Sequence, residues 1–109
     1  MKKLIFIFLL SNKVIFPQTA ILDTNSIIIG EQVNFIISNR ITETNIWPTY
    51  TDFLVEGIEI IKEGKLDTAK NVISQNFIIT VWDSGSYYIP SISFSKNSKT
   101  EGLLLNVQS

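Results

Sequence analysis

The sequence predicts an all-β protein, an immunoglobulin-like antiparallel β-sandwich of about seven strands. Three observations support this fold class. Ile alone accounts for 19 of the 109 residues, and β-branched and aromatic types, which favour strands, dominate every apolar run. Apolar residues alternate with a period of two in several segments. The five glycines fall between the apolar runs, where turns need conformations that glycine adopts easily.

The amino terminus has the layout of a secretory signal peptide. Lys2 and Lys3 precede a seven-residue apolar run, 4–10, which is far shorter than the roughly 20 residues that span a bilayer. We therefore expect residues 1–18 to be a signal peptide and residues 19–109 to form the exported domain. A buried first strand of a cytosolic protein is the alternative. No Cys follows the apolar run, which excludes a lipoprotein anchor.

Removal of the expected signal peptide would make the net charge of the protein more negative. The whole chain has 9 basic and 10 acidic residues, a net charge of −1. Removal of residues 1–18 takes away three lysines and no acid, which leaves 6 bases against 10 acids and a net charge of −4. The remaining bases are scattered along the sequence, so no basic stripe is present to neutralise phosphates. Nucleic acid is therefore not expected as a partner.

Four strands are expected in the amino-terminal half. The second shows the clearest alternation, with Val33, Phe35 and Ile37 on one face and Asn34 and Ser38 on the other. The apolar runs between turn residues place the four strands at 20–29, 32–39, 44–50 and 53–61.

Three further strands are expected in the carboxy-terminal half. Phe77, Ile79 and Val81 alternate along the first, and Ile92 and Phe94 alternate with serines in the second. Their predicted positions are 71–83, 86–95 and 101–108. Residues 65–73 are ambiguous, because their apolar side chains at helical spacing also suit a short helix of one or two turns; such a helix is the alternative to strand structure there.

The most specific local signal is the string Asp83-Ser84-Gly85-Ser86-Tyr87 at the junction of two predicted strands. In immunoglobulin-like sandwiches an Asp-x-Gly-x-Tyr string marks the tyrosine corner, where glycine permits a tight turn and the tyrosine hydroxyl bonds back to a main-chain group. We therefore predict a structural corner formed by Asp83, Gly85 and Tyr87. An ordinary hairpin turn with an unrelated tyrosine is the alternative.

The position of the corner tyrosine indicates which residues would stand in place of the usual inter-sheet disulfide. Ile89 stands where the second cysteine of such domains lies, and Phe35 or Ile37 stands where the first would be. An apolar contact is expected between them. Trp47 would pack across this contact, with Trp82 as the alternative core aromatic.

Arg40 is the only arginine of the chain, and its guanidinium is suited to a bidentate pair with a carboxylate. Because an arginine near the end of another strand can hold the corner aspartate, we predict an ion pair between Arg40 and Asp83.

The composition excludes most catalytic chemistry. The chain has no His and no Cys, so it offers no imidazole base, no thiolate nucleophile and no Cys or His zinc ligands. The local carboxylate cluster, Glu56, Glu59 and Glu63, is interpreted as a solvated edge. Closely spaced Asp and Asn residues of the kind that bind calcium are too sparse. No enzyme activity, metal or cofactor is expected.

The segment Phe77 to Pro90, with residues 28–32 upstream and Trp47-Pro48 between them, resembles the amino-terminal immunoglobulin-like domain of BatD-like (oxygen-tolerance) bacterial envelope proteins. The Asp-Ser-Gly-x-Tyr-x-Ile-Pro string is the most distinctive part of the match. The resemblance implies a non-catalytic domain in the periplasm or on the periplasmic face of the inner membrane. It also implies protein partners of the von Willebrand factor A type or with tetratricopeptide repeats.

Such domains normally continue into a linker and a transmembrane helix, whereas this sequence ends at Ser109. The resemblance therefore leaves a fragment of an anchored protein and an anchorless relative as two alternatives.

Two classes of function follow from the sequence. The first is a protein-interaction module, in which the uncharged stretches 27–29 and 87–90 would contact a partner or take up an added strand. The second is a cell-surface adhesin or carbohydrate-binding sandwich, for which Trp47, Tyr50 and Trp82 would have to form one exposed platform. The burial of these aromatics decides between the two classes.

Overall fold

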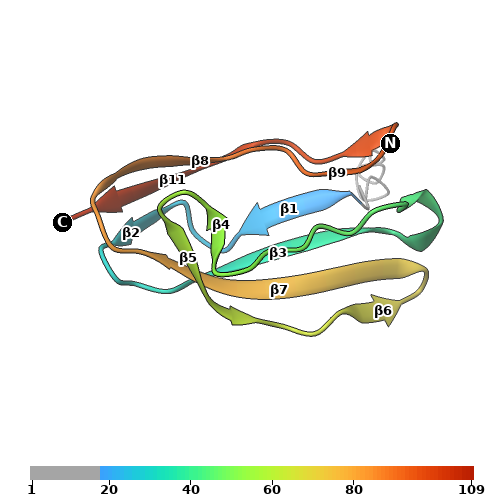
Figure 1. The fold of residues 1–109 in the computed structure, drawn as a ribbon, viewed down its shortest axis with the longest axis horizontal. Coiled ribbons are helices and arrows are strands. Elements are labelled where there is room, and N and C mark those ends of the chain that lie inside the picture. The colour runs from blue at the N-terminus through green and yellow to red at the C-terminus, as the bar shows by residue number, and fades with distance from the viewer. Residues whose placement is uncertain (1–17) are drawn as a thin grey trace, which may run out of the picture.

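The chain folds as an immunoglobulin-like β-sandwich in which two sheets enclose one apolar core (Figure 1). The computed structural model describes residues 18–109. The signal peptide expected in residues 1–18 therefore lies outside the described residues, apart from Gln18. Within the described part, no helix is long and apolar enough to cross a membrane.

The larger sheet has the strand order β1-β3-β7-β5-β4, with β6 paired to the beginning of β7. All neighbouring strands in it are antiparallel. Its strands are β1 (Thr19–Leu22), β3 (Val33–Arg40), β4 (Phe53–Val55), β5 (Ile58–Glu63), β6 (Asp67–Ala69) and β7 (Val72–Val81).

The smaller sheet has the order β2-β11-β8, in which β11 is antiparallel to β8 and parallel to β2. A short hairpin, β9 with β10, follows β8. The bounds of these strands are β2 (Ser26–Ile28), β8 (Gly85–Ile89), β9 (Ser93–Ser95), β10 (Ser98–Lys99) and β11 (Leu103–Gln108).

The predicted alternation places the core correctly on the two longest strands. Val33, Phe35 and Ile37 of β3 are buried, and the inward side chains of β7 pack beside them. Phe35 and Phe77 lie with ring centroids 6.2 Å apart. The opposite sheet contributes its own buried positions, so both inner faces are apolar. Those positions are Ile27, Ile89, Leu105 and Val107.

Three of the predicted strands are each divided in two. Residues 20–29 form β1 and β2, which belong to different sheets, so the chain crosses from one sheet to the other between Leu22 and Ser26. A turn at Gly57, whose φ is +92°, separates β4 from β5. Pro90 ends β8 because proline has no N–H to continue a ladder.

The strand predicted at 44–50 is not formed. A single 3₁₀ turn, Ile41–Glu43, precedes this segment, and the segment itself runs extended without joining a sheet. Its main chain reaches the rest of the fold where the N–H groups of Asn45 and Ile46 both donate to the carbonyl of Phe94. Pro48 lacks an N–H, which removes a ladder donor from the middle of the segment.

The short helix given as the alternative at 65–73 is not formed either. This region is a hairpin in which Ala69 pairs with Val72 across Lys70 and Asn71. Both turn residues have positive φ, +53° and +67°, which is typical of a tight two-residue hairpin turn. The helical spacing of apolar side chains did not indicate a buried helix face, because Leu66 is exposed and does not belong to the core.

Candidate interaction surface

The tyrosine corner brings Asp83, Gly85 and Tyr87 together as the sequence predicts. The hydroxyl of Tyr87 donates to the main-chain carbonyl of Asp83 at 2.9 Å, and Gly85 has a φ of +143°. The ring of Tyr87 rests on Gly57, so closely that a Cβ at Gly57 would lie 2.6 Å from the ring. The corner therefore fixes the start of β8 against the turn between β4 and β5.

Replacement of Tyr87 by phenylalanine is expected to lower the free energy of unfolding by about 1 kcal/mol, the net value of one hydrogen bond. Chemical denaturation of the purified chain measures this. Tyr88→Phe is the matched control, because the Tyr88 hydroxyl makes no hydrogen bond within residues 18–109 and the side chain is 61% exposed. Equal stability of the two variants would contradict the structural role of the corner bond.

The predicted ion pair between Arg40 and Asp83 is wrong. Arg40 pairs in register with Val72, at one end of β7, whereas Asp83 follows Val81 at the other end, about 30 Å along an extended strand. Arg40 instead lies 3.9 Å from the carboxylate of Glu43, on the 3₁₀ turn beside it. Sequence patterns did not show which end of its strand faces the corner.

Phe35, Ile37 and Ile89, the residues expected to replace the inter-sheet disulfide, are all in the buried core. Trp47 is partly buried against this core, with its ring 5.2 Å from that of Phe94. Its indole N–H donates to the side chain of buried Gln75 at 2.8 Å. Trp47 thus packs on the inner side of the sandwich, as the first of the two alternatives predicts.

Trp47, Tyr50 and Trp82 do not form one exposed platform. Tyr50 packs edge-on against Phe77 in the core, and burial raises the pKa of its phenol above the ordinary value. Trp82 is 57% exposed and donates its indole N–H to Glu59 at 2.6 Å. Because two of the three aromatics pack inward, these three side chains do not supply the flat aromatic face that a carbohydrate-binding sandwich would need.

The carboxylates of the local acidic cluster point in different directions. Glu59 accepts the bond from Trp82, Glu63 accepts one from the side chain of Gln75, and Glu56 lies in the turn between β4 and β5. Within residues 18–109, no group of three or more His, Cys, Asp or Glu side chains is arranged to hold a metal ion.

The outer edge of β8 is open, and the register identifies the main-chain groups that it presents. Asn106 and Gln108 of β11 hydrogen-bond toward β2, so the alternate residues Leu105 and Val107 face β8. These pair with Tyr87 and Gly85, which leaves the N–H and C=O groups of Ser86 and Tyr88 directed away from β11. Neither residue has a main-chain partner on that side within residues 18–109.

An apolar groove lies beside this edge. It has a volume of about 240 Å³ and runs between the end of β8 and the segment that leads into β4. Pro48, Tyr50 and Leu54 line one wall, and Ile89, Pro90 and Ile92 line the other. The unpaired segment 44–50 explains both features, because its Pro48 and Tyr50 line the groove together with Ile89, while no residue of the segment pairs with β8.

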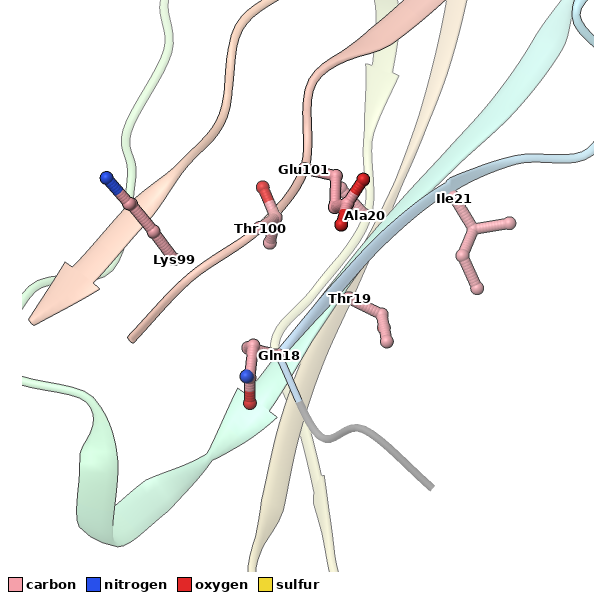
Figure 2. Close-up of a pocket in the computed structure, with 7 residues that line it drawn as sticks. All are labelled: Gln18, Thr19, Ala20, Ile21, Lys99, Thr100 and Glu101. Atoms are coloured by element: carbon pink, nitrogen blue, oxygen red, sulfur yellow. The ribbon is translucent and has the colours of Figure 1, made fainter. Parts of the chain in front are cut away.

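A second hollow, of about 430 Å³, lies between β1 and residues 99–101 (Figure 2). Gln18 and residues 19–21 of β1 line one side of it, and Lys99, Thr100 and Glu101 line the other (Figure 2). The buried hydroxyl of Thr100 already accepts a hydrogen bond from the main chain of Ile92. The edge of β8 is therefore the better candidate site, because it combines free main-chain groups with an apolar groove.

Sequence reasoning identified residues 87–90 as a possible contact but not the open edge itself. The signal that could have found it is Pro48, which argues against a paired strand in 44–50. No protein-family model, no curated protein and no solved structure matches the chain.

Proposed function

We propose that residues 19–109 form a non-catalytic protein-interaction module of the bacterial cell envelope, which binds an extended segment of a partner protein along the open edge of β8. The observation that carries this proposal is the pair of residues Ser86 and Tyr88, whose main-chain groups face outward beside an apolar groove. An added strand would satisfy these groups and place alternate side chains in the groove.

The envelope location rests on the sequence of residues 1–18, which has a charged start and a short apolar run. The resemblance to BatD-like amino-terminal domains supports the same location and extends the proposal to the periplasmic face of the inner membrane. It also names the class of partner, proteins with von Willebrand factor A type domains or tetratricopeptide repeats.

Site-specific photocrosslinking in intact cells tests the proposal. A photoreactive amino acid at Ser86 is expected to crosslink an envelope protein, whereas the same probe at Ile36, on the outer face of the larger sheet, is not. Identical crosslinked products from both positions would contradict binding at the β8 edge.

Tyr88→Pro then tests whether the main chain is the binding element. Proline removes an N–H that the folded domain does not use, so we expect the fold to persist and the Ser86 crosslink to be lost. Tyr88→Ala removes the ring but keeps the N–H and is expected to retain the crosslink. Loss of the crosslink in both variants, or in neither, would contradict pairing through the main chain.

A further inference from the structure

The bases of the domain are unevenly placed, whereas its acids are found at both ends. Arg40 and Val72 mark one end of the paired strands β3 and β7, and Asp83 lies beyond the other end. At the Asp83 end, the loop before β3 is tied to β7 where Thr80 donates to the carbonyl of Glu31 and Gly30 donates to that of Val81. This end, called here the corner end, carries five carboxylates: Glu31, Asp52, Glu56, Glu59 and Asp83.

Five of the six bases of residues 18–109 lie toward the other end. Ser98 donates to the buried side chain of Asn39, which places the β9–β10 hairpin and its two lysines at the Arg40 end. Lys65 and Lys70 flank β6, which pairs with the beginning of β7 at that same end. The sixth base of residues 18–109, Lys62, pairs in register with Ile78 on the larger sheet. Among residues 18–109, Lys62 is thus the one base near the corner end, and no arginine or lysine lies in the turns that carry Asp83 and Glu56.

The corner end is also where the open edge of β8 begins. Tyr87 bonds to Asp83, and its ring rests on Gly57, the neighbour of Glu56. Asp83 and Glu56 are both exposed. The one salt bridge among the described residues joins Arg40 to Glu43, so neither carboxylate is neutralised by a side chain there. A strand paired with Ser86 and Tyr88 would end beside these two carboxylates.

We infer that the segment bound at the β8 edge is an extended peptide with apolar side chains at alternate positions and a basic side chain beside Asp83 and Glu56. This inference rests on the proposed function and names the chemistry of its partner. Residues opposite Tyr87 and Ile89 would face the groove formed by Pro48, Tyr50 and Leu54, so they are apolar. Charge complementarity excludes an acidic end for the segment and favours lysine or arginine.

A second copy of this chain fits the edge less well. Two domains would each carry a net charge of −4, and the edge of β8 itself holds no base that could meet the carboxylates of a neighbour. Concentration-dependent dimers of the full chain in sedimentation experiments, lost in Tyr88→Pro, would overturn the inference in favour of edge-to-edge pairing.

Two blocked peptides provide the direct test. One is acetylated and amidated Lys-Thr-Val-Thr-Val-Thr-Lys, and the other has glutamate in place of both lysines. Lysine at both ends makes the test independent of strand direction. The lysine peptide is expected to bind the full chain about tenfold more tightly at low salt, and the difference should shrink at high salt because exposed charges are screened. Equal affinities would overturn the inference.

Charge-reversal variants at opposite ends of the domain test which carboxylates affect binding of the lysine peptide. Glu56→Lys is expected to weaken binding of the lysine peptide about fivefold, as reversal of one exposed charge would. Asp67→Lys makes the same change of charge on β6, at the Arg40 end, and is expected to alter binding less than twofold. Equal weakening by both variants would show that net charge, and not the corner end, determines binding.

Amide protection separates this inference from the proposed function. Bound lysine peptide is expected to slow hydrogen exchange at the amides of Ser86 and Tyr88. If both peptides protect these amides equally, edge binding stands and the charge preference fails. If neither peptide binds at millimolar concentration, the inferred chemistry is wrong, while the crosslink from Ser86 still decides the proposed function.

Discussion

Replacement of Phe35 by alanine is expected to lower the free energy of unfolding by about 3–5 kcal/mol, the usual cost of removing a buried aromatic side chain. Phe35 is fully buried on β3, and its ring lies beside that of Phe77. Alanine would leave a cavity between the sheets where such domains often have a disulfide. This chain has no Cys, so packing alone holds the sheets together at this point.

Chemical denaturation monitored by tryptophan fluorescence measures this loss. Phe53→Ala is the matched control, because Phe53 is 53% exposed on the short strand β4 and its removal opens no internal cavity. We expect the control to lose less than about 1 kcal/mol. A similar loss in both variants would contradict the placement of Phe35 at the centre of the core.

The position of Phe35 could be predicted from the sequence because strand alternation is a local property. In β3 and β7 every second residue faces the core, and the pattern of apolar residues shows this directly. The points where the chain changes sheet could not be predicted in this way. Residues 20–29 look like one apolar strand, yet β1 and β2 pair with different partners. Only the pairing of distant strands decides where the chain crosses.

The same distinction between local and long-range contacts applies to the candidate site. The tyrosine corner was predictable because Tyr87 bonds to a residue four positions away, so the whole motif lies within one short string. The proposed partner for Arg40 required a contact between distant segments, and it was wrong. The edge of β8 is open because residues 44–50 do not form a strand that pairs with it. The sequence of that segment suggested a paired strand instead.

Replacement of Gly57 by alanine is expected to cost about 3 kcal/mol, for two separable reasons. Gly57 has a φ of +92°, a conformation that costs an L-residue roughly 1–2 kcal/mol. A Cβ at this position would also lie 2.6 Å from the ring of Tyr87, and overpacking of this kind adds about 1–3 kcal/mol.

Gly30→Ala separates the two contributions. Gly30 has a φ of +85°, almost that of Gly57, but its Cβ would lie 3.3 Å from the exposed ring of Trp82, which can move aside. We therefore expect Gly30→Ala to show the backbone cost alone, about 1–2 kcal/mol. Equal losses in the two variants would mean that the ring of Tyr87 does not rest on Gly57.

The difference between the two glycine variants also bears on binding. If the contact between Gly57 and Tyr87 positions β8, Gly57→Ala will shift the start of that strand and weaken crosslinking from Ser86. Gly30→Ala will leave crosslinking unchanged, because Gly30 lies against Trp82 on the outer face of the larger sheet. Such a result would connect the tyrosine corner, which the sequence predicts, to the open edge, which depends on the fold.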